Sequence, residues 1–424
     1  MSDELETVAS FRARARAFAE STLPAAGSAR ARSMTMPEAK SLQAKIFDAG
    51  FAGIAVPQEY GGAGLTLEHQ EAWADEVASR IVPTPLFVSL GMLAITLLDH
   101  GSETLKRRHI PRILRGEEVW IQLLSEPSGG SDMAGVMTRA TRDGDTWVLN
   151  GAKMWSTGAG EADYGMCLAR TDWDAPKHRG LSMFAVPLRD PKVTIEAIVG
   201  IEGGPAHFFQ EFIDDVALPD DHLIGDENDG WSVAHALLFH ERNATAGVGH
   251  GLGLGGGRNE GGGATGSGVD DLIDFARRSG TTADAATRQL IAEAFVTHEV
   301  RQHLNDRVTV GMRTHAFKGD WGSLLKLGLA LDTLRRGEVG LQLAGADGVI
   351  WNDDTEATTG TTDGTTDGAA GRTWLSARSI SIAGGTNEMQ RNIVSERLLG
   401  MPREPATDRD VPFSEVVRRR SDRS

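Results

Sequence analysis

Two short segments carry hydroxyl side chains, and the first of them also has a helix-stopping proline and two adjacent glycines. The first, residues 124–132, reads LSEPSGGSD, and the second, residues 153–157, reads KMWST. Pro127 ends any preceding helix, and Gly129 and Gly130 let the backbone approach a flat ligand closely. The spacing therefore predicts a loop and a strand that face one ligand.

The side chains in these segments match the polar edges and the face of a ring system. Ser125, Ser131 and Thr157 offer hydrogen-bond donors, and Trp155 can cover one ring face. Either segment alone is also typical of a surface turn or an unrelated strand. Both together, in this order, predict a cradle for a flavin.

Three more segments complete a resemblance to the acyl-CoA dehydrogenase family. They read VPQEYGGAG at 56–64, AGGTNEMQRN at 383–392 and ERLLGMPR at 396–403, in the family's order and with similar gaps. The resemblance covers nearly the whole chain. It implies FAD as the cofactor and a β-oxidation step of lipid metabolism, in which the α-proton of an acyl-CoA thioester is removed while hydride leaves the β-carbon for flavin N5.

The resemblance also implies which residues contact the cofactor. The expected set is Leu124, Ser125, Gly130, Ser131, Trp155, Ser156, Thr157, Gln342, Gly345, Thr386 and Glu388. Two departures weaken this part of the match. Ala346 stands where the family has a second glycine, and the family's Arg-x-x-Phe-Gly pattern, which reaches the flavin pyrophosphate, has no clear match between residues 269 and 292.

The family reaction needs a carboxylate base and donors at the thioester oxygen. Many members carry the base as a Glu directly before the Gly-Thr of the closing motif, but this chain has Gly384 there. A second family arrangement, seen in isovaleryl-CoA and long-chain dehydrogenases, places the base on an earlier helix. Glu241 matches that position; its alternative is an exposed helical charge pair with Arg242.

A glycine at position 384 has a chemical consequence in this arrangement. Its backbone N–H can still donate to the thioester oxygen, and its missing side chain avoids a second carboxylate beside Glu241. It also leaves space near the α-carbon, so we expect a branched or bulky acyl group. The catalytic residues predicted are therefore Glu241 and Gly384.

The resemblance places four residues at the substrate: Ser131, Phe239, Arg242 and Gly385. Arg242 resembles a family arginine near the CoA adenine and phosphates, because a fixed guanidinium suits anionic groups. A structural salt bridge is the other interpretation of this residue.

Composition excludes several classes of protein. The chain of 424 residues has 40% hydrophobic and 24% charged residues and no apolar run near the roughly 18 residues of a membrane span. A net charge of −16 argues against nucleic acid as a partner. The acidic N-terminus lacks the pattern of a secretory signal, and one cysteine, Cys167, cannot form an internal disulfide, so we expect a cytoplasmic protein.

Periodicity predicts an α+β multidomain protein, because helical spacing gives way to short strands and then returns. We expect a helical N-terminal domain at 1–118, a β-sheet or barrel middle domain at 119–225 and a C-terminal four-helix-bundle-like domain at 226–402, followed by a tail at 403–424. Within the third domain we expect helices at 231–246, 269–278, 285–310, 323–344 and 387–399. Gly50 and Gly101 are expected as left-handed helix caps, and the sequence RDGD at 142–145 as a hairpin turn.

Two inserts, at 247–268 and 353–371, have compositions typical of flexible loops. The first contains GxGxxG, but a helix precedes it where a dinucleotide-binding fold needs a strand. His298 and His303 lie five residues apart, which does not fit the zinc-protease spacing of four. No metal site is expected.

The sequence is compatible with three functions. The first is an FAD-dependent acyl-CoA dehydrogenase that forms a 2-enoyl-CoA and passes electrons to an electron-transfer flavoprotein. The second is a catalytically silent subunit of a heteromeric dehydrogenase, and the third is an acyl-CoA oxidase or flavin monooxygenase on the same architecture. By analogy we expect a homodimer or homotetramer, with a heteromer as the alternative.

Overall fold

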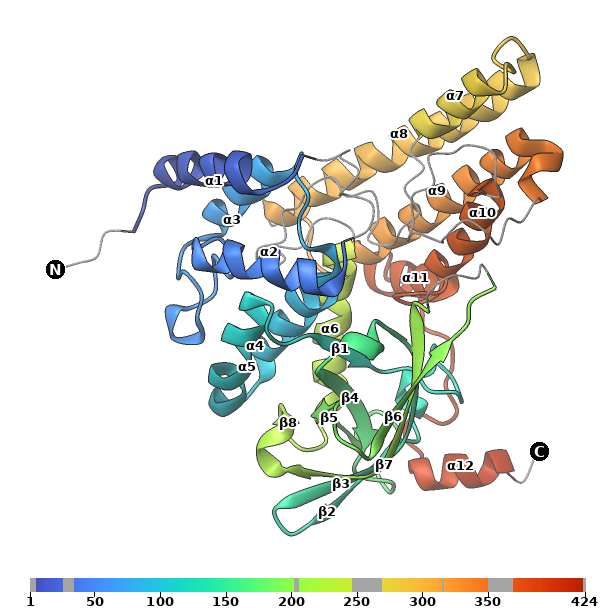
Figure 1. Cartoon of the computed structure of the whole chain (residues 1–424). Coiled ribbons are helices and arrows are strands. Elements are labelled where there is room, and N and C mark those ends of the chain that lie inside the picture. Colours follow the sequence, from blue (N-terminus) through green and yellow to red (C-terminus); the bar gives the residue numbers. More distant parts are fainter. Residues whose placement is uncertain are drawn as a thin grey trace.

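The computed structural model describes residues 5–25, 34–201, 206–245, 269–314, 316–349 and 369–421. A helical N-terminal part, a β-sheet and a helical C-terminal part follow one another (Figure 1), which confirms the predicted fold class. The insert at 247–268, with its GxGxxG, lies outside the described residues, as do residues 353–368 of the second insert.

Five helices build the described residues of the N-terminal part. They are α1 (Val8–Thr22), α2 (Met36–Asp48), α3 (Leu67–Val77), α4 (Ala94–His100) and α5 (Glu103–Arg115). All but α4 have a capping side chain at their N-terminus. A capping box between Thr35 and Glu38 begins α2. The buried rings of Phe51 and Trp73 stack with centroids 4.7 Å apart, so aromatic packing closes this part of the core.

One of the two predicted glycine caps is wrong. Gly50 has the expected left-handed φ of 77°, but Gly101 has an extended backbone with φ −66°. The reason is the next helix: Ser102 is the N-cap of α5 and needs an extended approach. A Cβ on Gly101 would lie 2.5 Å from the Leu97 carbonyl oxygen, so glycine serves close packing here.

The middle part is a strongly twisted sheet. Its strands are β1 (Trp120–Leu123), β2 (Arg139–Asp143), β3 (Thr146–Thr157), β4 (Tyr164–Arg170), β5 (Leu181–Pro187), β6 (Val193–Ile198), β7 (Phe208–Pro219) and β8 (Leu223–Ile224). The order is β6-β7-β3-β2-β4-β5-β8, and β1 pairs with β4 in parallel. The predicted turn at 142–145 joins β2 to β3, with Gly144 at φ 62°.

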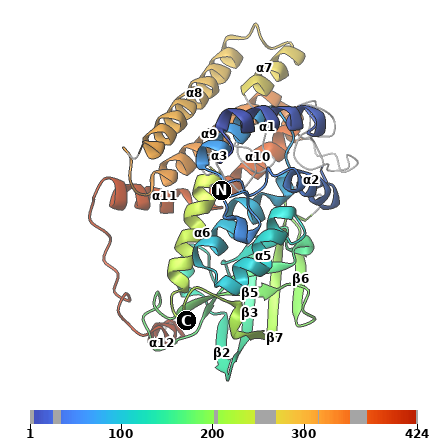
Figure 2. The ribbon, with the colours of Figure 1, turned by 90° about the vertical axis from the view of Figure 1, so that its left-hand side faces the viewer.

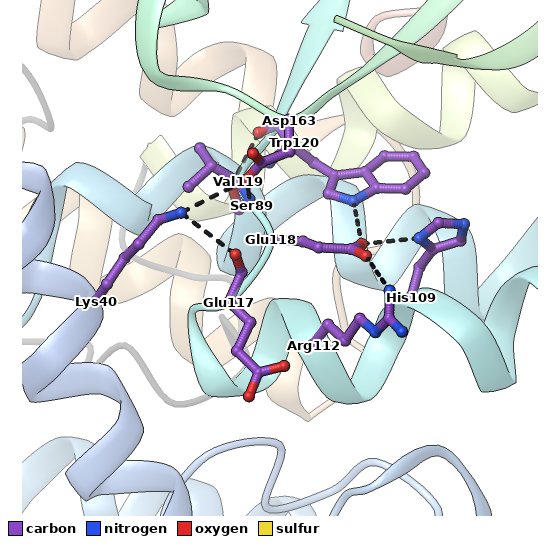
Figure 3. A network of polar contacts seen from close by, with 9 residues as sticks. All are labelled: Lys40, Ser89, His109, Arg112, Glu117, Glu118, Val119, Trp120 and Asp163. Atoms are coloured by element: carbon purple, nitrogen blue, oxygen red, sulfur yellow. Dashed lines mark hydrogen bonds and ion pairs between the residues drawn. The ribbon is translucent and has the colours of Figure 1, made fainter. Parts of the chain in front are cut away.

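A polar network fixes the start of β1 against the N-terminal helices (Figure 3). Glu118 accepts hydrogen bonds from His109 Nδ1 at 2.7 Å, Arg112 at 3.1 Å and the Trp120 indole at 3.1 Å. Ser89 Oγ bonds to both the backbone N–H and the carbonyl of Trp120. Because β1 leads directly into residues 124–132, this network sets where that loop begins.

Helices return after the sheet. They are α6 (Gly230–Thr245), α7 (Val269–Arg278), α8 (Ala285–Arg313), α9 (Trp321–Ala344), α10 (Ala369–Ile380) and α11 (Asn387–Ile393). The four helices predicted between 231 and 344 are confirmed. The helix predicted at 387–399 is regular only to Ile393, because Val394–Leu398 is a π-helical turn. Sequence patterning missed α10, which begins at Ala369, inside the second predicted insert, so the expectation of a loop up to residue 371 is wrong for residues 369–371.

A last helix, α12 (Phe413–Ser421), lies beside the sheet rather than beside the other C-terminal helices (Figure 2). Phe413 is buried, and the Arg170 guanidinium lies 3.6 Å from its ring centroid. The Lys177 ammonium pairs with both Asp408 and Asp132. Part of the segment expected to be a tail therefore braces the loop that contains Asp132.

Candidate active site

The structure brings the two hydroxyl-rich segments into direct contact. The Met154 N–H donates to the Ser125 carbonyl at 2.9 Å, which joins strand β3 to the 124–132 loop. The buried Lys153 ammonium donates to the carbonyls of Leu124 at 3.4 Å and Leu168 at 2.7 Å. The loop and the strand thus form one unit.

Glu126 is the anion that completes this unit. It accepts from Lys153 Nζ at 2.8 Å and from the N–H groups of Met137 at 2.6 Å and Thr138 at 2.9 Å. Burial raises the pKa of Glu126. The charge and hydrogen bond of Lys153, together with the hydrogen bonds from Thr138 and Met137, outweigh this effect of burial and hold the pKa below its ordinary value. A filled, ionised carboxylate therefore fixes the shape of the loop.

Trp155 is held in an unusual position on β3. Its φ is 68°, uncommon for a residue with a side chain, and its side chain is 55% exposed although it is a large apolar group. It forms one wall of a hollow of about 240 Å³, where Phe208 and Ile198 of the sheet face Leu375 of α10. An indole exposed in this way can lie against a flat ring.

The predicted hydroxyl groups divide into two sets. Ser131 and Thr157 are exposed. A Cβ on Gly130 would lie 3.2 Å from Ser125 Oγ, so the absence of a side chain at Gly130 lets the loop close over Ser125. Ser156 instead points into the sheet, where its Oγ lies 2.6 Å from Glu211 Oε2. Burial raises the pKa of Glu211 to about 7.

Taken together, these residues fit a flavin ring. They supply an exposed aromatic face at Trp155, hydroxyls at Ser131 and Thr157, and a loop in which Gly130 permits close approach. The fit comes from the surroundings of each side chain rather than from the sequence motif alone.

Glu241 projects from α6 toward the closing motif. Its Oε2 atom is buried with no hydrogen-bond partner among the described residues. Burial raises the pKa of Glu241, opposed more weakly by the charge of Arg242, a hydrogen bond from Gln122 and the charge of Lys326. A carboxylate with a free buried oxygen and a raised pKa can accept a proton.

Gly384 lies directly against this carboxylate. A Cβ built on Gly384 would stand 3.3 Å from Glu241 Oε1, and the residue has a left-handed φ of 66°. Among the described residues, no acceptor is found for the N–H of Gly384 or of Gly385. The turn thus places Gly384, whose N–H has no acceptor in the described residues, beside the carboxylate, and the equally unbonded N–H of Gly385 follows it in the chain.

The other predicted residues have varied surroundings. Arg242 is buried and lies 3.4 Å from Asp320 Oδ1, so the salt bridge that we considered as an alternative is formed. Thr386 caps α11 through its hydroxyl, and Glu388 pairs with Arg391 at 3.4 Å. The remaining members, Phe239, Gly385, Gln342 and Gly345, are all exposed.

Three residues near Glu241 were not foreseen: Gln122, Lys326 and Gln390. Lys326 Nζ donates to the Gly385 carbonyl at 2.8 Å, and Gln390 Nε2 donates to the Gly384 carbonyl at 2.9 Å. A polar residue on an apolar helix was the available signal for Lys326, because it interrupts the pattern LLKLGLAL at 324–331.

Comparison with known proteins decides the family. Sequence models of the acyl-CoA dehydrogenase N-terminal, middle and C-terminal domains match residues 6–117, 122–213 and 228–399. The chain is 32% identical over 368 residues to "Acyl-CoA dehydrogenase IpdE1" of Mycobacterium tuberculosis, covering 87% of this chain and 89% of that protein. The chain belongs to the acyl-CoA dehydrogenase family. It is accordingly an oxidoreductase that acts on acyl-CoA, and FAD is its cofactor.

Solved structures agree with this assignment. The "Tcur3481-Tcur3483 steroid ACAD" is 27% identical, with a TM-score of 0.72, and the match covers 95% of this chain and 99% of that one. A glutaryl-CoA dehydrogenase from Mycobacterium smegmatis in complex with FADH2 shares the fold at 21% identity and a TM-score of 0.66, over 95% of this chain and 97% of that one. No helix in the described part of this family member is long and apolar enough to cross a membrane.

Proposed function

We propose that this protein dehydrogenates an acyl-CoA thioester to the 2-enoyl-CoA, with Glu241 as the base that removes the α-proton. The observation that supports this assignment most directly is the contact between Glu241 and the closing glycine turn. The carboxylate lies against Gly384 and keeps one buried oxygen without a partner. Such an oxygen is available for a proton, whereas a fully bonded one is not.

The residues of the site have distinct roles in this reaction. Glu241 Oε2 takes up the α-proton, and the N–H groups of Gly384 and Gly385 donate to the thioester oxygen, where negative charge develops. Trp155 holds one face of the ring system, and FAD when bound accepts the hydride from the β-carbon. Electrons then pass to an electron-transfer flavoprotein.

The substrate proposed is a thioester with a branched or ring-bearing acyl group. Gly384 supports this because it has no side chain at the position beside Glu241 and Lys326 where a Cβ would stand. The steroid dehydrogenase that resembles this chain gives independent support for a bulky acyl group. We also propose that the working form is an oligomer, because Gln342 and Gly345, which the family resemblance places at the adenosine end of FAD across a dimer interface, are exposed here.

The decisive experiment is anaerobic flavin reduction followed by visible absorption. We expect the purified protein to carry a flavin spectrum that bleaches with a branched or ring-bearing acyl-CoA and not with short straight chains. Glu241→Gln keeps the shape and removes the base, so the reduction rate should fall about 10²–10⁴-fold with the flavin still bound. Reduction of this variant at a near wild-type rate would remove Glu241 from the mechanism.

Two observations favour a second function, a catalytically silent subunit. The missing Arg-x-x-Phe-Gly pattern weakens the expected hold on the flavin pyrophosphate, and the name of the steroid dehydrogenase joins two designations, Tcur3481 and Tcur3483. A protein that stays colourless with added FAD and gains flavin only when produced with a partner would establish that function. Reoxidation by air at the rate given by an electron-transfer flavoprotein would indicate an oxidase instead.

A further inference from the structure

Lys326 is a buried lysine beside the proposed base, and the sequence motifs assign it no role. It lies on α9 with 3% of its surface exposed. Its Nζ donates to the Gly385 carbonyl at 2.8 Å, and this is its one hydrogen bond within the part of the chain that the structure describes. A buried ammonium bonded to a carbonyl alone still needs a nearby negative charge.

The geometry shows which negative charge is available. A Cβ on Gly384 would stand 3.3 Å from Glu241 Oε1 and 3.9 Å from Lys326 Cε, so both side chains approach the position where a side chain of residue 384 would begin. Each also shifts the other: Lys326 lowers the pKa of Glu241, and Glu241 raises that of Lys326 against a larger effect of burial. The net result for Lys326 is a pKa lowered to about 8.

Other groups also act on Glu241. Arg242, on the same helix, lowers the pKa of Glu241 more than Lys326 does, and its guanidinium also pairs with Asp320 Oδ1 at 3.4 Å. Glu388 of α11 is exposed and acts on Lys326 from the other side. Gln122 of β1 is neutral. Lys326 is therefore the cation near Glu241 that has no ion-pair partner of its own in the described residues.

Lys326 also holds the backbone donors in place. The Gly385 carbonyl accepts from both Lys326 and Gln390, the latter at 3.2 Å, and Gln390 also donates to the Gly384 carbonyl at 2.9 Å. With both carbonyls bonded from helices α9 and α11, the turn cannot rotate freely, and its N–H groups keep one direction.

We propose that Lys326 is a positioning residue for the dehydrogenation: its ammonium fixes the Gly384–Gly385 turn and keeps Glu241 ionised until that carboxylate takes up the α-proton. Lys326 keeps its own protons throughout. This inference rests on the proposed function, because it concerns the same base.

The test is the pH dependence of anaerobic flavin reduction in three variants, measured with an acyl-CoA that reduces the wild type. In Lys326→Met the acid limb of the curve of reduction rate against pH should move to higher pH by about one unit or more, because the positive charge that favours the ionised form of Glu241 is lost. Lys326→Arg keeps a cation and should restore the limb. Lys326→Gln keeps a donor without the charge, so its limb should shift like that of Lys326→Met, and it provides the same measurement if the methionine variant does not fold.

A merely structural role predicts a different result. It would lower the melting temperature or the flavin content and leave the acid limb in place. An unshifted limb in both Lys326→Met and Lys326→Gln overturns the inference while Glu241→Gln remains inactive. An active Glu241→Gln would instead overturn the proposed function, so the two failures are distinguishable.

Discussion

Glu126 and Glu241 are both glutamates that lie near a buried lysine, yet their surroundings are opposite. Glu126 is bonded to Lys153 and to two backbone N–H groups, and these hold its pKa low. Glu241 keeps one buried oxygen without a partner, and burial raises its pKa. Its lysine, Lys326, bonds to a carbonyl instead.

The difference separates a carboxylate that shapes the fold from one that is available for chemistry. Hydrogen bonds to both oxygens of a buried carboxylate stabilise its ionised form and leave no unbonded oxygen for a substrate. Leaving an acceptor site open has a cost in stability and gives a group that can change its protonation state.

The largest effect on stability is expected for Glu126→Gln. The amide leaves the buried Lys153 ammonium without its anion and faces two N–H donors with a single oxygen. We expect the free energy of unfolding in urea to fall by about 3–5 kcal/mol. The exposed Glu161→Gln is the matched control. A loss no larger than that of the control would contradict the structural role of Glu126.

Glu211 provides an intermediate case, because burial raises its pKa from 4.5 to about 7 and one of its oxygens has no partner. Between these values the folded state holds a proton that the unfolded state has lost, so stability falls as the pH rises through this window. The free energy of unfolding of the wild type should fall by at most about 3 kcal/mol across this pH window, and Glu211→Gln should remove this dependence on pH. Urea unfolding at several pH values from 4.5 to 8 is the measurement, with the exposed Glu196→Gln as the control. Equal slopes in all three proteins would refute the prediction.

The smallest effect on stability is expected at the glycine beside Glu241. Gly384 and Gly400 share a φ of 66°, but a Cβ would touch Glu241 at the first and nothing within 4 Å at the second. Replacing either by Ala should cost about 1–2 kcal/mol from the left-handed backbone alone. Only Gly384→Ala should also slow flavin reduction. If both alanine variants reduced flavin equally fast, crowding at Glu241 would have no part in the reaction.

Local patterns were sufficient to predict most helices and the fold class. The helices predicted at 269–278 and 323–344 lie where the structure has α7 and α9, because their apolar spacing is strong and their ends carry turn residues. The prediction of Gly101 as a left-handed helix cap was wrong because a capping glycine and a close-packed glycine cannot be told apart from the sequence around them. Helix α12 was missed because Phe413 and Val416 are buried only by contact with a distant part of the chain.

The sequence by itself determined the family, and it supplied the predictions of the flavin cradle residues and of Glu241 as the base, since these depend on motifs that lie together along the chain. The identity of the partners around each carboxylate was decided only by the tertiary structure. Lys153 bonds to Glu126, which lies 27 residues away in the sequence, and Lys326 bonds to Gly385, which lies 59 residues away. Charge pairing and burial act through space, so only the folded chain shows which glutamate is filled and which is free.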